Sequence, residues 1–213
     1  MSHLFNTHAA LLDAAVAATQ SRTYWSAFSD VPRTYGEEPP RAGAIAYRVG
    51  IVPDELHGDL DSVLEVDVEH ARRLGVAVHR YPADKDATDL ELSLDRAVTL
   101  GAERIVVVGA GGGRLDHQLG ELLLLASPKY ARVVLEARLG GSVVHPVRGG
   151  PRSITAPPGS NVSIVPIAGP ATVTTTGLRW PLRAEQLEPG STRGISNELD
   201  ADVATVATVD GVV

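Results

Sequence analysis

The chain contains no cysteine among its 213 residues, which excludes disulfides, thiolate chemistry and cysteine-ligated metal sites. Aromatic residues make up only 4%, so a hydrophobic core must be built mainly from valine, leucine, isoleucine and alanine. No apolar run approaches the length of about 20 residues that spans a membrane, and the N-terminus lacks the pattern of a secretory signal. We therefore expect a cytoplasmic protein without a membrane partner.

Positive charge is in deficit, with 19 lysines and arginines against 26 acidic residues and a net charge of −7. A general nucleic-acid binder needs a basic surface to neutralise phosphates, so we expect no nucleic-acid partner. An acidic protein can still bind nucleotides where cations are local or a metal bridges the phosphates. The length allows one large domain or two small ones.

The hydrophobic pattern divides the chain into three segments. Residues 1–43 combine a helical pattern over 5–20 with a proline-rich connector, and they predict an atypical N-terminal helical appendage. Over 44–141 short strands alternate with helices, which predicts an α/β domain with right-handed βαβ units and a parallel sheet. Over 142–213 the helical period disappears, and β-rich pieces between glycines and prolines predict an all-β sandwich or small barrel.

Periodicity also predicts the single elements of these segments. Helices are expected over 64–74, 88–100 and 115–126, and strands over 76–79, 104–108 and 133–135. The helix over 88–100 opens with a capping box made by Thr88 and Glu91. Its apolar face is expected to carry Leu90, Leu94, Ala97 and Val98. The β-rich pieces are 142–147, 152–155, 161–167, 171–176 and 202–208.

Polar clusters occur where strands are expected to end, and the first is an Asp-x-Asp sequence over 58–62. In an extended chain Asp59 and Asp61, which flank Leu60, project to the same side. Two such carboxylates repel each other unless a cation lies between them, an arrangement that Mg²⁺ sites exploit. The alternative is an ordinary solvated turn.

A second cluster lies between a strand and the capped helix. Lys85 is suited to meet a phosphate, while Asp86 and Asp89 can complete a metal shell. The alternative is that Asp89 only complements the positive end of the helix dipole.

The third cluster is a glycine-rich turn over 109–113, followed by Arg114. It is neither a dinucleotide fingerprint nor a P-loop. Its backbone can approach a ligand closely, and Arg114 can grip a phosphate bidentately. Such a strand-to-helix turn is often only structural, and His117 on the next helix is more often an ordinary partner than a catalyst.

In the third segment Trp180 lies in a loop beside a proline. A tryptophan presented by a loop near serine and asparagine, here Ser196 and Asn197, can stack on a heteroaromatic ring and hydrogen-bond it. The alternative is an indole that only packs on the surface.

Together these motifs resemble those of the thiamine pyrophosphokinase family over about residues 44–213. The matching stretches are 53–62, 81–92, 112–117, 176–182 and 193–198. The resemblance implies an α/β nucleotide domain over 44–141 and a thiamine-binding β-sandwich over 142–213. It also implies a homodimer with thiamine bound between subunits, and transfer of the pyrophosphoryl group of ATP to thiamine with Mg²⁺, releasing AMP.

The resemblance also implies roles for single residues. The metal ligands would be Asp59, Asp61 and Asp89, with Asp86 and Asp116 close by. The catalytic set would be Asp59, Asp61, Asp86, Asp89 and Arg114. ATP would be held by Lys85, Thr88, Gly112, Gly113, Arg114, Asp116 and His117, and thiamine by Trp180, Ser196 and Asn197.

The N-terminal part departs from this family, which begins with two strands and an Asp-Gly-Gly-Ala turn that helps form the nucleotide site. Residues 42–48 stand in that place without the aspartate or the paired glycines, so the first strands are expected to be missing. Residues 5–36 instead resemble the N-terminus of the phenylacetate-degradation aldehyde dehydrogenase PaaN. Two alternatives therefore remain: a catalytically impaired thiamine- or nucleotide-binding remnant or fusion, and an assembly module whose N-terminal helix pairs with a partner.

Overall fold

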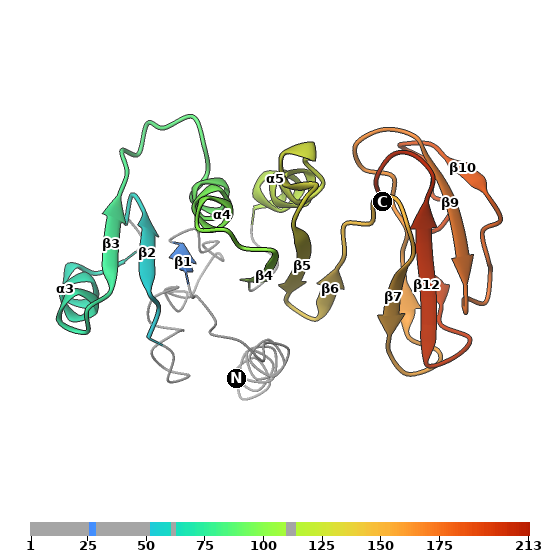
Figure 1. The fold of residues 1–213 in the computed structure, drawn as a ribbon, viewed down its shortest axis with the longest axis horizontal. Helices are drawn as coiled ribbons and strands as arrows, with labels where there is room; N and C mark the ends of the chain where they lie inside the picture. Colours follow the sequence, from blue (N-terminus) through green and yellow to red (C-terminus); the bar gives the residue numbers. More distant parts are fainter. Residues whose placement is uncertain (1–25, 29–51, 61–62, 110–113) are drawn as a thin grey trace. The chain divides into compact units, whose positions relative to one another are not determined.

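The computed structural model describes residues 26–28, 52–60, 63–109 and 114–213 (Figure 1). The chain divides into two compact units, the first made of Met1–Glu121 with Val133–Val144 and the second of Leu122–Arg132 with His145–Val213. Within the described ranges, no helix is long and apolar enough to cross a membrane.

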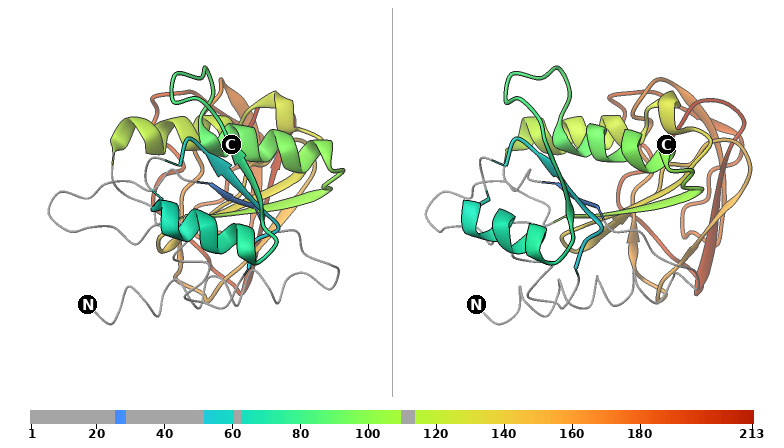
Figure 2. Two further views of the ribbon diagram at one scale, coloured as in Figure 1. Left: turned by 90° about the vertical axis from the view of Figure 1, so that its left-hand side faces the viewer. Right: turned by 60° about the vertical axis from the view of Figure 1, so that its left-hand side comes forward.

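The first unit contains a three-stranded parallel sheet in the order β1-β2-β3. Its strands are β1 (Ser26–Phe28), β2 (Glu55–Gly58) and β3 (Ala77–Arg80). Leu56 of β2 pairs with Ala27 on one side and Val78 on the other. The helices α3 (Glu65–Arg73) and α4 (Asp89–Thr99) follow β2 and β3 in the chain, and Figure 2 shows them on opposite sides of the sheet.

The alternation of side chains along β2 explains this layering, since successive residues point to opposite faces. On one face Leu56 packs in an apolar cluster with Val68 and Ala71 of α3. On the other face Glu55 is hydrogen-bonded to Arg96 of α4. The two faces of this sheet therefore differ in kind, one dry and apolar and the other polar and buried.

Helix α4 begins where the sequence predicts, because the hydroxyl of Thr88 accepts a hydrogen bond from the Glu91 N–H at 3.2 Å. Leu90 and Leu94 are buried as expected. The expectation for Val98 is wrong, since this side chain is exposed in the last turn of the helix. Only the first two turns of the apolar stripe are buried at this helix.

A second sheet of the first unit consists of β4 (Arg104–Gly109), β5 (Val134–Leu139) and β6 (Ser142–Val144). Strands β4 and β5 are parallel, and β6 is antiparallel to β5. Helix α5 (Leu115–Leu125) and the short 3₁₀ helix η1 (Pro128–Tyr130) connect β4 to β5. This β4-α5-β5 order is the alternation that the sequence predicts, with β5 longer than the expected 133–135.

The second unit contains a four-stranded antiparallel sheet in the order β10-β9-β12-β7 and a separate antiparallel pair, β11 with β8. The strands are β7 (Arg152–Thr155), β8 (Asn161–Val162), β9 (Ala171–Thr176), β10 (Glu185–Leu187), β11 (Asn197–Glu198) and β12 (Val203–Thr208). Alternate residues of β9 and β12 are buried. Their core also includes Ile164, Leu178, Leu182 and Leu199 from the connecting segments.

The structure is thus α/β with a β-rich C-terminal part, as expected. The strand β1 was not expected, because it lies inside the stretch 1–43 that the sequence predicts to be a helical appendage. The helix expected over 5–20 and the turn position at 42–48 lie outside the described residues. The boundaries at residues 43 and 141 stay predictions.

Candidate functional site

Two carboxylates expected to bind metal meet at one cation in the first unit. Asp59 directly follows β2, and Asp89 is the first residue of α4. The ammonium nitrogen of Lys85 lies 2.9 Å from Oδ1 of Asp89 and 3.8 Å from Oδ2 of Asp59. The structure therefore brings together three of the predicted site residues from three different segments.

Partial burial strengthens the electrostatics of this group. The side chains of Asp89, Lys85 and Asp59 are 6%, 16% and 22% exposed. Charges that are shielded from water interact more strongly than charges at an open surface. Two formal negative charges face one positive charge, so the group has an excess of one negative charge and suits a further cation.

The end of β2 is shaped by an unusual turn. Leu60 has a φ of 63°, in the left-handed region, so the expectation of an extended Asp-x-Asp stretch is wrong at its central residue. The reason is packing, since Leu60 is buried in the same apolar cluster as Val63 and Val68. The N–H of Val63 donates to the carbonyl of Leu60 at 3.2 Å. Asp61 itself lies outside the described residues.

The other residues predicted around this site have different surroundings. Asp86 is exposed, and Thr88 serves as the N-cap of α4. Gly112 and Gly113 lie outside the described residues. The hydroxyl of Thr88 accepts the hydrogen bond that caps α4. A role of Thr88 in ATP binding stays a prediction.

At the start of α5, Arg114 pairs with a carboxylate. Its Nε donates to Oδ1 of Asp116 at 3.1 Å, and its Nη2 contacts the other carboxylate oxygen. This guanidinium lowers the pKa of Asp116 from 3.8 to about 2. Both side chains are exposed. His117 follows in the first turn of the same helix, where its part in ATP binding also stays a prediction.

Strands β2 and β3 and helix α4 also carry a set of residues that the sequence analysis did not identify. We call it the polar layer, and it consists of Glu55, His57, His79, Tyr81 and Arg96. Arg96 binds the Glu55 carboxylate with both Nε, at 3.0 Å from Oε2, and Nη2, at 2.7 Å from Oε1. Nε2 of His57 lies 2.8 Å from Oε2 of Glu55. The alternation of glutamate and histidine at 55 and 57 was the only indication in the sequence.

Burial decides the protonation of His57 in this layer. The ring is fully buried, and desolvation lowers its pKa, with the hydrogen bond to the Glu55 carboxylate only partly opposing the shift. A neutral ring with its proton on Nε2 donates to Glu55. It then accepts at Nδ1 from the Tyr81 hydroxyl, 3.3 Å away. His79 stacks on His57 with ring centroids 4.6 Å apart.

Three members of the polar layer have the composition of a metal site. Ligand atoms of Glu55, His57 and His79 lie within 4.8 Å of one another, and two imidazoles with a carboxylate suit zinc. Two features oppose such a role. The guanidinium of Arg96 already occupies both oxygens of Glu55. The two rings are within 14° of parallel, so their in-plane lone pairs do not converge on one point. Arg96 is thus the cation of this cluster.

The second unit places Trp180 and Asn197 in direct contact. The N–H of Trp180 donates to Oδ1 of Asn197 at 3.1 Å, and Nδ2 of Asn197 donates to the Trp180 carbonyl at 2.7 Å. The same Oδ1 accepts from the N–H of Glu198 at 2.9 Å. The buried amide of Asn197 therefore holds the backbone of the Trp180 loop, while the indole is 46% exposed.

The indole is also oriented by a cation. The guanidinium of Arg179 lies 4.9 Å from the centre of the Trp180 ring, within the range of a cation–π contact. Arg179 in turn forms an ion pair with Glu198 at 2.7 Å. Ser196 has a φ of 57°, and its N–H donates to the hydroxyl of Ser163 at 3.1 Å. Trp180 thus lies in a loop next to Asn197, the first residue of β11, and Ser196 directly precedes that strand.

Two glycines allow these segments to lie close to neighbouring backbone. Gly177 has a φ of 70°, and a Cβ there would collide with the carbonyl oxygen of Val203. Gly194 has a φ of 98°, and a Cβ there would lie 2.7 Å from the carbonyl oxygen of Ile164. Only glycine adopts both the left-handed backbone and this close contact without strain. The two motifs 176–182 and 193–198 each contain one such position.

Two family models match this chain. "Thiamin pyrophosphokinase, catalytic domain" matches residues 16–135, and "Thiamin pyrophosphokinase, vitamin B1 binding domain" matches residues 152–213. Thiamine pyrophosphokinase of Bacillus subtilis is 34% identical over 167 residues, covering 76% of this chain and 77% of the relative. Thiamine pyrophosphokinase 1 of Arabidopsis thaliana is 31% identical over 190 residues, covering 82% and 70%.

Solved structures agree with these matches. The crystal structure of thiamine pyrophosphokinase from Bacillus subtilis superposes with a TM-score of 0.76 at 28% identity, covering 92% of this chain and 88% of that one. The enzyme from Geobacillus thermodenitrificans gives a TM-score of 0.72 at 29% identity, covering 92% and 86%. The resemblance of residues 5–36 to the aldehyde dehydrogenase stays a prediction, and the catalytic-domain match includes β1.

Proposed function

This chain belongs to the thiamine pyrophosphokinase family, and we propose that its two units act together in transferring the pyrophosphoryl group of ATP to thiamine. The products are thiamine diphosphate and AMP. The observation that carries the proposal is the shared cation of Asp59 and Asp89, because two carboxylates at the end of β2 and the start of α4 converge on Lys85. Such a group suits a site for a magnesium–polyphosphate complex.

The donors of this site fit Mg²⁺, a hard cation that prefers oxygen ligands. Asp59 and Asp89 would hold it, with Asp61 as a third ligand and Asp86 close by. Bound Mg²⁺ would supply neutralisation of the phosphate charge. The thiamine hydroxyl displaces AMP at the β-phosphorus, so the protein's main task is to align the two substrates and balance their charge.

Lys85 and Arg114 are the proposed phosphate ligands. The ammonium of Lys85 already lies at the carboxylate group, where it can meet a phosphate that arrives with the metal. Arg114 stands at the N-terminus of α5, where helix N–H groups also favour an anion. Thr88, Gly112, Gly113, Asp116 and His117 complete the proposed ATP site.

Thiamine is proposed to bind at the Trp180 loop of the second unit. The exposed indole offers a stacking surface, and Arg179 and Asn197 hold it in place. Because the Asn197 amide is engaged by backbone groups, we assign it to orienting the loop, with Ser196 left to contact the ligand. The core shared by β9, β12 and the segments around β8 and β11 supports a sandwich here. A cytoplasmic homodimer with thiamine between subunits completes the proposal.

The test is formation of AMP from ATP and Mg²⁺, measured with and without thiamine. The proposal expects AMP to appear only when thiamine is present, together with an equal amount of thiamine diphosphate. Binding of thiamine and ATP without AMP would favour the impaired remnant. AMP that forms equally without thiamine would identify a different acceptor, such as water.

A further inference from the structure

The distance between Asp59 and Asp89 depends on how α4 is placed on β2. Asp59 lies just past the end of β2, and Asp89 is the first residue of α4. The chain that joins them runs through α3 and β3, so it does not by itself hold them close together. Their approach therefore needs contacts that hold the helix against the strand.

One such contact is the ion pair between Glu55 and Arg96. Glu55 is the first residue of β2, four positions before Asp59, so it lies about 13 Å back along the strand. Arg96 is seven positions after Asp89, which is two helical turns and about 10.5 Å along α4. Residues seven apart share one face of a helix, so Asp89 and Arg96 both face the sheet.

The two ion pairs thus connect α4 to β2 at two points. At one end Lys85 lies between Asp59 and Asp89, and at the other Arg96 binds Glu55 through two parallel hydrogen bonds. A bidentate pair fixes orientation as well as distance, unlike a single contact. Two points of attachment restrict both the sliding of the helix and its rotation about its own axis.

We propose that Arg96 is a positioning residue, which holds α4 on β2 so that Asp59 and Asp89 face the same cation. The Glu55 side chain is only 8% exposed, and the buried His57 supports its second oxygen. Glu55 is therefore a fixed anchor for the helix. The consequence for catalysis rests on the proposed function, whereas the geometric claim does not.

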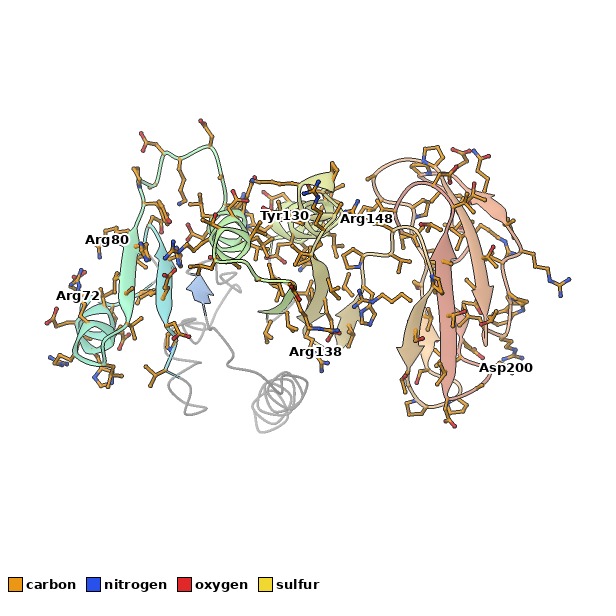
Figure 3. The ribbon with its side chains drawn as sticks, in the orientation of Figure 1. Arg72, Arg80, Tyr130, Arg138, Arg148 and Asp200 are labelled. Atoms are coloured by element: carbon orange, nitrogen blue, oxygen red, sulfur yellow. The ribbon has the colours of Figure 1, made fainter. Side chains whose placement is uncertain are left out.

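The first experiment compares Arg96→Gln and Arg96→Lys with a matched control. Arg80→Gln removes an ion pair of 2.9 Å between Arg80 of β3, labelled in Figure 3, and Glu65 of α3, away from α4. We expect Arg96→Gln to raise the Mg²⁺ concentration for half-maximal activity and to lower kcat, each by about 10- to 100-fold. Arg96→Lys should recover part of both losses, while KM for thiamine stays unchanged.

A purely structural role for Arg96 would lower the unfolding temperature without changing the Mg²⁺ dependence. If Arg96→Gln matches Arg80→Gln in kcat and in Mg²⁺ dependence, the positioning role is overturned. Circular dichroism spectra recorded beside each assay establish that the compared variants are folded.

The second experiment does not depend on turnover. Crystal structures of the wild type and of Arg96→Gln should show Asp89 displaced relative to Asp59 by more than about 0.5 Å, the tolerance of a working site. Unchanged positions of both carboxylates would overturn the inference. A wild type that makes no AMP would count against the proposed function alone, because the comparison of structures still decides the placement of α4.

Discussion

Asn197 holds Trp180 by its backbone on both sides, accepting from its N–H at 3.1 Å and donating to its carbonyl at 2.7 Å. Both ends of the amide are therefore used inside the protein. An asparagine that the sequence suggests as a ligand group acts in the structure as a support for the neighbouring tryptophan. Its substitution should alter the shape of the loop before it alters any contact with a ligand.

Asn197→Ala should destabilise the second unit by about 1–3 kcal/mol, because it leaves partly buried backbone groups without their partners. Asn197→Asp keeps the acceptor oxygen but replaces the Nδ2 donor by a carboxylate oxygen that faces the Trp180 carbonyl, so its loss should be at least as large. Urea unfolding measures both, with Trp180 fluorescence followed in a Trp25→Phe background. Equal stability of Asn197→Ala and wild type would contradict the supporting role.

Asp59→Asn should reduce kcat by at least about 100-fold, because a metal ion supplies several kcal/mol of charge stabilisation in the transition state. Asp84→Asn is a suitable control, since it neutralises an exposed carboxylate beside Lys85, in the connection between β3 and α4. Mg²⁺-dependent formation of AMP measures both. If the two variants retain similar activity, Asp59 is not a metal ligand.

Trp180→Ala should weaken thiamine binding far more than ATP binding. Stacking contributes about 0.5–1.5 kcal/mol beyond the area buried, so removal of the ring costs at least that much. Trp180→Phe retains an aromatic face and should recover part of the affinity. Isothermal titration with each ligand separates the effects, and equal weakening of both ligands by Trp180→Ala would argue against the thiamine assignment.

Asp116 should titrate at about 2 rather than at 3.8, because the Arg114 guanidinium stabilises its charged form. The pKa is depressed in the folded state, so the stabilisation is present above 3.8 and is lost as the pH falls through about 2. In Arg114→Gln the pKa should return toward its ordinary value. Carboxyl chemical shifts recorded by NMR against pH measure it, and an unchanged pKa in the variant would show that the pair does not persist in solution.

Ala27→Pro should destabilise the first unit and lower activity, since proline removes an N–H donor from β1, which pairs with β2. Ala27→Val keeps the donor and suits a strand, so it serves as the control. Hydrogen exchange of the β2 amides reports the effect directly. Full activity and unchanged exchange in Ala27→Pro would mean that β1 is dispensable, as expected for a loosely attached appendage.

Elements that follow one simple pattern were predicted from the sequence. Strands β7 and β9 have the expected bounds, and α4 starts at its expected cap because Thr88 and the apolar stripe agree. Short strands such as β11 were not predicted, because two residues are too few to show an alternation of apolar and polar side chains. The ordered motifs predicted the family, and both family models agree with it.

The polar layer could not be predicted from sequence patterns, and the reason is physical. A glutamate and a histidine two positions apart ordinarily indicate a solvated strand face. Here that face is covered by α4, and Arg96, forty-one positions later in the chain, makes the burial of Glu55 tolerable. Pairs so distant in sequence become visible only when the fold brings them together. The same holds for Asn197, because its partner is a backbone segment and not a side chain.

The left-handed backbone at Leu60 limits which residues can stand between the two aspartates. A left-handed backbone costs a leucine roughly 1–2 kcal/mol, whereas loss of a buried leucine side chain costs about 2–5 kcal/mol. Glycine would remove the first cost and incur the second, and a β-branched residue fits the backbone poorly. The residue between the two aspartates is therefore constrained by its backbone conformation and by its packing. Leu60 should therefore tolerate neither glycine, which loses the buried side chain, nor a β-branched residue, which strains the left-handed backbone.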